Sequence, residues 1–430
     1  MQLLLVQREA GGTLLLGEEG SDRSLPVRNH SKSTIGPASA RNMDQSPERK
    51  RRVASSSRTV KASAFLTLAS ATLVAATSTA LADIDPLSGI DFVRIGAVGN
   101  APWMGNGQPG DDAIGRGSVG YEYSIGRYEV TTSQWVQFFN AAYDRPAGDP
   151  NLPWLTPPTF WGAQGTTPNT PGGRRWTVPA GNEMRPVGNI SWRMAAMYCN
   201  WLHNDKATNR EAFLSGAYDV STFGPNGMGG FADQPTRSPG ARYFIPSRDE
   251  WIKAAHYDPH RYGENQGGYW EFSNSTDEWI PGGPPGVNVN IGPGGPGPNP
   301  DGPLAQANYG WDTFTFPGYG SPFSVPLGAY PDVQSPWGLL DVAGATSEWT
   351  EQIFYGALEG PRSRFVEGSH WNGAPGYGLG DSISFSPGQI APNLSAFDFG
   401  FRIASAVPGP TGLVVLASGC VLVVTRRKRE

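Results

Sequence analysis

One short segment of the chain places two acidic side chains where a metal ion could use them. Asp341 and Glu348 lie at the two ends of a tight turn that contains glycine. Calcium is a hard cation that takes six to eight oxygen ligands, partly from carboxylates and partly from backbone carbonyls. A calcium-binding loop is therefore one interpretation of this segment. The alternative is a solvated turn that the neighbouring Trp349 anchors to the core.

His370 is the histidine best placed to do chemistry, since it stands beside Trp371 in a loop-like stretch. The competing interpretation is that His370 packs or forms a hydrogen bond, which is the commoner role of a lone histidine. His256 and His260 have the spacing of two metal ligands on a helix, but Pro259 between them ends a helix there. No Ser-His-Asp order and no glycine-rich phosphate loop is evident.

Composition limits the classes of function. The net charge is −5 and charged residues make up 17% of the chain, so a nucleic-acid partner is not expected. Cys199 lies in the body of the chain and Cys420 in the C-terminal tail. An internal disulfide between them is therefore not expected.

The C-terminal residues resemble a sorting signal. A proline-rich break is followed by an apolar run at 412–424 and then by basic residues. The run is shorter than a full membrane span, and a buried C-terminal helix is the alternative. The arrangement resembles the PEP-CTERM class of bacterial signals, with Gly409 where glutamate is usual. The residues that define it, over 406–430, are Pro408, Pro410, Arg426, Arg427, Lys428 and Arg429.

The N-terminal region predicts export. Basic residues at 49–52 precede an apolar stretch at 64–81, and Ala80 and Ala82 form a cleavage site before Asp83. We therefore interpret 43–82 as a signal peptide. Residues 1–42 are either a disordered leader or a misassigned start upstream of Met43. Together with the tail, this predicts an exported protein of the cell envelope that is membrane-anchored or released to the surface after sorting.

The body between the two signals, residues 83–405, is rich in loops. Glycine (57) and proline (39) are abundant. Helices are predicted after the capping box of Thr131 and Gln134, after Ser191, and after the capping box of Ser247 and Glu250. The stretch at 121–128 alternates like a strand, and 281–303 is a Gly/Pro tract expected to be an inserted surface loop. These features predict an α+β fold with little regular structure.

The body resembles the sulfatase-modifying-factor, or formylglycine-generating enzyme, family over about 120–403. Seven motifs occur in the family's order: YEVT at 128–131, PVGNISW with AAMYCNWL at 186–202, IPSRDEWIKAA at 245–255, ANY at 307–309, WGLLDVAGATSEWT at 337–350, GSHWN at 368–372 and GFR at 400–402. The resemblance implies a C-type-lectin-like fold that contains calcium.

The resemblance also implies an oxidation that this chain lacks the residues to perform. Family enzymes oxidise a sulfatase cysteine with copper held by two cysteines, and soft thiolates select Cu(I). Gly373 and Gly378 stand at the matching positions, and no cysteine occurs at 200–419. Copper and the family's oxidase activity are therefore not expected.

Calcium is expected, because the family's ligand positions are largely kept. The resemblance implies one ion held by the side chains of Asp341 and Glu348 and by the carbonyls of Gly344 and Thr346. A second ion would use Asn308 and the carbonyl of Tyr309, with Asp312 in place of an acidic residue that does not align.

Two functions from different classes follow. The first is a calcium-stabilised, non-catalytic binding or scaffold module that is recognised by the envelope sorting machinery and holds a carbohydrate or protein ligand. The second is an oxidoreductase with altered, non-thiolate metal chemistry around His370. Tryptophans in Gly/Pro-rich context either stack on such a ligand or anchor the core: they are Trp154, Trp161, Trp176, Trp270 and Trp279.

Overall fold

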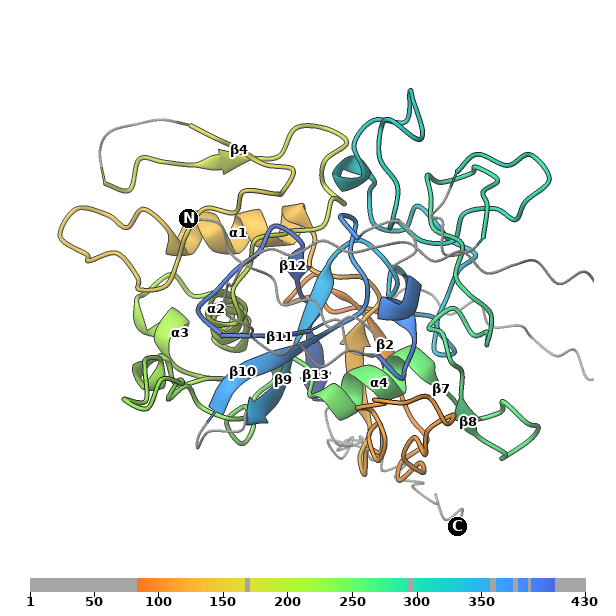
Figure 1. Ribbon diagram of the computed structural model, residues 1–430. Helices are drawn as coiled ribbons and strands as arrows, with labels where there is room; N and C mark the ends of the chain where they lie inside the picture. Colours follow the sequence, from red (N-terminus) through yellow and green to blue (C-terminus); the bar gives the residue numbers. More distant parts are fainter. Residues whose placement is uncertain are drawn as a thin grey trace, which may run out of the picture. The chain divides into compact units, whose positions relative to one another are not determined.

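The computed structural model describes residues 83–166, 171–291, 297–355, 361–373, 378–385 and 388–406 (Figure 1). The predicted leader, signal peptide with Ala80 and Ala82, and sorting tail all lie outside the described residues. Every described residue belongs to one compact unit of the chain, 76–430. No helix in this described part is long and apolar enough to cross a membrane.

Three helices begin where the capping residues predict. α1 (Thr132–Ala142) starts after Thr131 and α4 (Arg248–His256) after Ser247, and both have a complete capping box. α2 (Trp192–His203) starts after Ser191, whose hydroxyl accepts from the Met194 N–H. α4 ends at His256, before Pro259, so the helix break predicted there is confirmed. A short helix, α3 (Glu211–Leu214), follows α2.

A five-stranded sheet joins the two ends of the described chain. Its order is β1 (Asp83–Ile84), β2 (Asp91–Ile95), β3 (Tyr123–Gly126), β13 (Ala404–Ala406) and β6 (Tyr243–Phe244). All neighbouring pairs are antiparallel, with Ala404 opposite both Ile125 and Phe244. The last described strand is therefore central to the sheet rather than an edge.

A four-stranded sheet carries the segments that hold the predicted site residues. Its order is β11 (Gly388–Ile390), β10 (Pro361–Glu367), β9 (Ser347–Tyr355) and β12 (Phe399–Gly400). β9 and β10 are its longest strands (Figure 1), and β12 runs parallel to β9. The 341–348 loop leads into β9, and the GSHWN motif follows β10.

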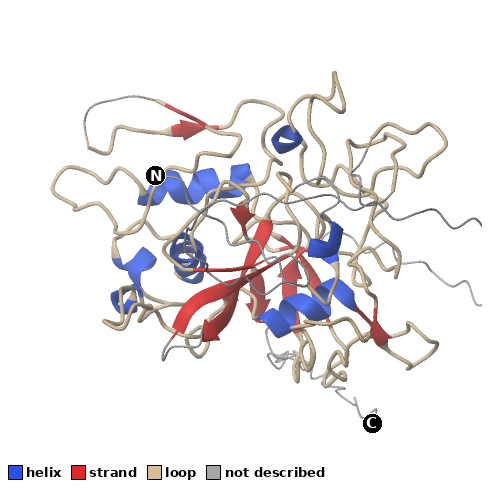
Figure 2. Cartoon of the chain, in the orientation of Figure 1, coloured by secondary structure: helices blue, strands red, loops and turns tan. Residues whose placement is uncertain are grey.

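Loops dominate the rest, as Figure 2 shows. Two further sheets have two short strands each, and three 3₁₀ helices interrupt the loops. The α+β, loop-rich fold class predicted from the sequence is confirmed. The short elements are β4 (Gln164–Gly165), β5 (Trp176–Thr177), β7 (Tyr257–Asp258), β8 (Gly268–Tyr269), η1 (Val220–Thr222), η2 (Pro322–Ser324) and η3 (Gly378–Asp381).

Aromatic rings fill the main core. Trp135 of α1 packs against Phe138, Tyr198 and Phe401, with ring centroids 4.9 to 5.8 Å apart. α2 contributes residues from nearly its whole circumference, because every residue from Trp192 to Leu202 is buried. Helix α2 is thus a central element rather than an amphipathic surface helix. Cys199 lies in it, buried and free.

Within the Gly/Pro tract at 281–303, the described residues 281–291 and 297–303 include some that pack inside the molecule. Val289 is fully buried and belongs to a small separate core with Trp311, Phe316 and Tyr330. The Val289 N–H also donates to the Pro303 carbonyl at 2.8 Å. The sequence pattern does not predict that Val289 is buried, because the glycines and prolines around it leave no periodic pattern.

Candidate functional site

Glu348 is already bonded to other side chains. Its Oε1 accepts from Arg402 Nη2 at 2.7 Å, and its Oε2 accepts from Arg402 Nε at 2.7 Å and from Trp251 Nε1 at 2.9 Å. The Glu348–Arg402 pair is excluded from solvent, with side-chain exposures of 1% and 0%. Glu348 thus ties the start of β9 to the GFR motif and to α4.

Other segments of the same chain contact the rest of the 341–348 loop. Buried Glu129 accepts from the Thr346 N–H at 3.0 Å and from the Thr346 hydroxyl at 2.6 Å. Gly344 has a φ of +84°, and a Cβ there would lie 2.7 Å from the Asn308 backbone nitrogen. The close approach of these two backbones therefore requires glycine.

Asp341 faces a different environment from Glu348. Its Oδ2 accepts from the Gly328 N–H at 2.6 Å, and its side chain lines a small cavity that Glu348 does not line. Burial raises the pKa of the Asp341 carboxyl to about 6. The structure therefore gives the two carboxylates of the predicted calcium site separate partners, and calcium at this loop stays a prediction.

Side chains of the residues named for the second calcium site form other hydrogen bonds, and that site, which would use the Tyr309 carbonyl, stays a prediction. The Asn308 amide donates to the Pro322 carbonyl at 2.9 Å and accepts from Trp311 Nε1 at 3.0 Å. The Tyr309 hydroxyl donates to the Ile280 carbonyl. Asp312 is solvent-exposed and accepts from backbone N–H groups within its own turn. In the described part of the chain, no group of three or more His, Cys, Asp or Glu side chains could hold a metal ion.

Ser369, in the GSHWN motif, connects this motif to the 341–348 loop. Its hydroxyl accepts from the Gly344 N–H and donates to Asp381 Oδ2, both at 2.8 Å. Its own N–H donates to Asp381 Oδ1 at 2.8 Å. Burial raises the pKa of Asp381 to about 7, against the effect of these hydrogen bonds. Asp381 belongs to none of the seven sequence motifs, so only the fold brings it to Ser369.

His370 pairs with an acid that lies far away in the sequence. Its Nδ1 is 3.2 Å from Asp398 Oδ2, and both side chains are largely enclosed, with exposures of 16% and 13%. Burial lowers the pKa of the His370 imidazole, while the Asp398 carboxylate acts in the opposite direction. Such a pair orients the ring and can assist proton transfer. The Gly373 N–H donates to the His370 carbonyl at 2.9 Å, and Gly378 begins η3.

Four aromatic rings from separate segments gather beside His370. Trp371 lies 5.5 Å from Phe160, 5.7 Å from Phe323 and 5.7 Å from Phe397, measured between ring centroids. All four are half-buried. Only Trp371 is a motif residue, because Phe160 and Phe397 come from loops and Phe323 from the short η2, none of which has a periodic pattern.

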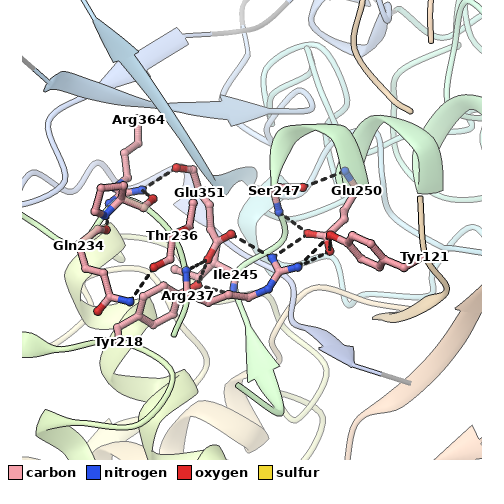
Figure 3. Close-up of polar contacts among 11 residues, drawn as sticks. Tyr121, Tyr218, Gln234, Thr236, Arg237, Ile245, Ser247, Glu250, Glu351 and Arg364 are labelled. Atoms are coloured by element: carbon pink, nitrogen blue, oxygen red, sulfur yellow. Dashed lines mark hydrogen bonds and ion pairs between the residues drawn. The ribbon is translucent and has the colours of Figure 1, made fainter. Parts of the chain in front are cut away.

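A cleft lies around Arg237 on another part of the described chain, and Figure 3 shows the polar contacts of this arginine. The Arg237 guanidinium donates to Glu250 at 2.7 and 3.1 Å and to Glu351 at 3.0 Å. Tyr121 adds a hydroxyl that donates to Glu250 at 2.8 Å, and Tyr218 donates to Glu351 at 2.7 Å. Figure 3 shows the three charged side chains pointing toward one another.

The charged groups of this network change one another's pKa values. Burial alone would lower the pKa of Arg237, but the Glu250 and Glu351 carboxylates outweigh it and raise that pKa. Burial raises the pKa of Glu351 and of Tyr121. One face of the guanidinium stacks on Phe244, 3.6 Å from the ring centroid. Arg237 is therefore fixed in position, as a residue of a preformed site would be.

The cleft has a volume of about 510 Å³ and a mixed lining. Tyr121 is 47% exposed and offers an aromatic face. Hydroxyls come from Thr236, Ser238 and Ser247, and Glu122 adds a carboxylate. An aromatic face with convergent hydroxyl, carboxylate and guanidinium groups suits a polar ligand such as a sugar or a peptide. The sequence pattern predicts only a helix cap at Ser247 and Glu250 and only a strand at Tyr121, and does not indicate that they meet at a cleft.

The five tryptophans considered as ligand-stacking residues serve mainly as anchors. Trp161 is buried and Trp176 half-buried against the rings of α1. Arg261 stacks on Trp270 at 4.4 Å, and Trp279 packs near Phe272. Trp154 is 39% exposed, and Arg193 covers one face of its ring at 4.1 Å.

Comparison with known proteins agrees with the motif order. The model of the FGE-sulfatase family, the sulfatase-modifying factor enzyme 1-like domain, matches residues 116–407. No curated protein matches the chain.

Similar solved structures include three that share 15–18% identity with the chain. CarF is 18% identical with a TM-score of 0.40, over 74% of this chain and 99% of CarF. Treponema denticola variable protein 1 (17%, TM-score 0.41) and PvdO from Pseudomonas aeruginosa (15%, TM-score 0.41) each cover 74% of this chain and 95% of their own. Because the family model spans more than half of the sequence, the chain belongs to the FGE-sulfatase family.

Proposed function

We propose that this protein is an exported, envelope-associated member of the family that binds a ligand and does not generate formylglycine. The observation that carries the proposal is the pair of glycines, Gly373 and Gly378, where the resemblance requires cysteines. Glycine has no side chain to coordinate a metal, and the copper chemistry needs soft thiolates. The fold is kept while the residues for this oxidation are missing.

Binding is supported by the preformed cleft around Arg237. Its volume of about 510 Å³ lies within the range of small-molecule sites. The Glu250 and Glu351 carboxylates hold the arginine in place before any ligand arrives, so binding would cost little side-chain entropy. A carbohydrate or a peptide segment is the ligand class that this lining suits.

Replacement of Tyr121 by alanine tests the cleft. We expect the full-length protein to bind members of a glycan or peptide array, and Y121A to lose that signal, because it removes the exposed aromatic wall. Tyr319 is a matched control, since its exposure of 51% is close to the 47% of Tyr121 and it does not line the cleft. Equal loss in Y121A and Y319A, or unchanged binding in Y121A, would contradict this role.

The missing oxidase activity has a direct test. The protein would be incubated with copper and a peptide that carries a sulfatase cysteine motif, and the products analysed by mass spectrometry. We expect the cysteine to remain unmodified. Formation of formylglycine would overturn the non-catalytic part of the proposal.

An oxidoreductase with altered metal chemistry is the second candidate, and the His370–Asp398 pair favours it. A carboxylate on one ring nitrogen is the usual partner of a metal-binding histidine. Metal analysis of the purified protein separates the candidates. Stoichiometric copper or iron that His370→Ala releases would support this enzyme and overturn the binding module.

Calcium remains a proposal drawn from the resemblance. Because Glu348 is bonded to Arg402, calcium at the 341–348 loop would require Glu348 to change partners. An ion that binds only the folded state raises its stability. Calcium should then raise the melting temperature of the unmodified protein above its value in chelator, and equal values would remove calcium from the proposal.

Export has its own experiment. Expression of the full chain in a bacterium that secretes such proteins should give a mature N-terminus at Asp83, after the predicted cleavage site at Ala80 and Ala82. Peptide mapping of the C-terminus shows whether the sorting tail is removed. An intact N-terminal segment in the cytoplasm would contradict the proposed localisation.

A further inference from the structure

A second hollow lies beside the Gly/Pro tract, away from the Arg237 cleft. Its wider part, the outer groove, has a volume of about 290 Å³ and includes Trp279 in its lining. Its narrow part, the inner chamber, has a volume of about 10 Å³, roughly the space of one water molecule. Asn274, Gln306 and Val333 line both parts, so the chamber and the groove are adjacent.

The charges along this hollow are all negative. Glu278 and Asp332 line the outer groove, and Asp341 lines the inner chamber. No lysine, arginine or histidine is among the described residues that line either part. The Arg402 charge acts on the Asp341 carboxylate from a distance, but its direct hydrogen bond is to the Asp341 backbone carbonyl and its carboxylate partner is Glu348. The Asp341 carboxylate thus has no ion-pair partner within the described chain.

The inner chamber presents hydrogen-bond acceptors without matching donors. Asn274 Oδ1 is enclosed and has no donor, while the Asn274 amide nitrogen donates to Gln306 Oε1 at 2.6 Å. Asp341 has one donor, the Gly328 N–H on its Oδ2. Buried acceptors without donors are costly, so an occupant that carries donors would stabilise this arrangement.

Size and donor number select the occupant. An alkylammonium group is about as large as a water molecule and carries three donors and one positive charge. A guanidinium is planar and larger, with five donors. Calcium needs six to eight oxygens, usually with several carboxylates, and the chamber offers one carboxylate. The ammonium is therefore the best match.

The outer groove suits the rest of such a molecule. Apolar groups from Pro281, Pro303, Ile291 and Val333, together with Trp279, can cover a methylene chain. Glu278 and Asp332 provide charge for a second cation farther out.

We propose that this hollow binds a primary alkylammonium group, with the nitrogen in the inner chamber on Asp341 and Asn274 and the alkyl stem along the outer groove. The source is a free linear diamine or a lysine side chain of a peptide. This site is separate from the Arg237 cleft, but it uses Asp341, which is also a ligand of the proposed calcium ion, so the two occupants exclude each other.

Isothermal titration calorimetry of the full-length protein tests the site. The probes are the diamine cadaverine, the monoamine n-pentylamine, a blocked lysine amide and the neutral alcohol n-pentanol. We expect the amines to bind and the alcohol not to. Tighter binding of cadaverine than of n-pentylamine indicates a diamine, and tighter binding of the lysine amide indicates a peptide.

Two sets of variants locate the binding. Asp341→Asn keeps an acceptor for the Gly328 N–H but removes the charge, and should weaken amine binding about tenfold or more. Asp219→Asn makes the same change on an exposed residue outside the hollow, keeps an acceptor for the Ser221 N–H, and should bind as the parent does. Glu278→Gln and Asp332→Asn should weaken cadaverine more than n-pentylamine, and because both residues are exposed the variants should fold normally.

Three results would overturn the proposal. The first is no amine binding to the parent protein. The second is equal amine binding in Asp341→Asn and the parent, with both folded by circular dichroism. The third is calcium that binds stoichiometrically and displaces cadaverine, since the chamber would then be a metal site.

Discussion

Several arginines of the described chain are held by carboxylates or stack on aromatic rings. Arg402 is fully buried on Glu348, and Arg237 lies between Glu250 and Glu351. Arg364 stacks over Trp192 at 3.5 Å and donates to backbone carbonyls in place of a carboxylate. Removing one partner of such a pair leaves an uncompensated charge in a medium of low polarity.

The Glu348–Arg402 pair gives the first residue-scale prediction. Glu348→Gln should lower the free energy of unfolding by about 3–5 kcal/mol, because Arg402 keeps its charge inside the core. Urea denaturation followed by tryptophan fluorescence measures it. Glu122→Gln is the control, since the Arg94–Glu122 pair is exposed, at 65% and 40%, and should be worth no more than about 1 kcal/mol. A similar small effect for both variants would contradict the structural role of Glu348.

Because the 341–348 loop contains this glutamate, Glu348→Ala alone cannot test calcium. The substitution destabilises the protein whether or not an ion binds. Only the effect of a chelator on the unmodified protein separates the two causes.

Asp381 gives a prediction about pH. Its carboxyl has a pKa of about 7 in the folded protein, above the ordinary 3.8, so the folded state binds more protons between these values. The stability that this group contributes is therefore largest at acidic pH and falls as the pH rises through about 7. Asp381→Asn cannot ionise, so its stability relative to the parent should rise by several kcal/mol, about 4 at most, between pH 4 and pH 8.

Urea denaturation of the parent and Asp381→Asn at a series of pH values measures this difference. Using the difference removes contributions from other groups, such as Asp341 and His370, that titrate in both proteins. A difference that does not vary with pH would show that Asp381 titrates normally.

At the scale of elements, the helix caps determine where three of the helices begin. Ser247 accepts from the Glu250 N–H at 3.2 Å, and its own N–H donates to Glu250 Oε2 at 2.7 Å. Glu250 also forms an ion pair with Arg237, which lines the cleft. The cap of α4 therefore helps to position this arginine. Glu250 thus serves both the local helix cap and the tertiary ion pair.

Ser247→Ala should therefore lower the free energy of unfolding by about 1 kcal/mol, the usual value of a lost N-cap. The matched control is Ser215→Ala, on an exposed serine that ends α3, which should change stability by less than about 0.5 kcal/mol. Thermal or urea denaturation compares them. No loss in Ser247→Ala would mean that the cap is not needed once α4 is packed.

At the scale of the whole molecule, the five-stranded sheet depends on the last described residues. β13 pairs with both β3 and β6, and Ala404 is fully buried. A chain that ends after Ala406 should keep its unfolding midpoint. One that ends after Ile403 should lose more than about 2 kcal/mol, since several backbone hydrogen bonds are lost together. Equal midpoints for the two truncations would show that β13 is dispensable.

The sequence alone determined the features that depend on neighbouring residues. The caps at Thr131, Ser191 and Ser247 fixed three helix starts, because a cap is a contact between residues three positions apart. The motif order indicated the family, and the sequence contains no cysteine at 200–419, since both are matters of residue identity.

Only the tertiary structure decided which partners the polar side chains take. Glu348 with Arg402, His370 with Asp398, and Arg237 with two glutamates are contacts between residues far apart in the sequence. The partners of a buried charge depend on which loops meet it, and short strands joined by Gly/Pro-rich loops carry no periodic pattern from which that meeting could be predicted. For the same reason only the structure shows that Glu348 pairs with Arg402 while Asp341 accepts from the Gly328 N–H, and calcium at this loop stays a prediction.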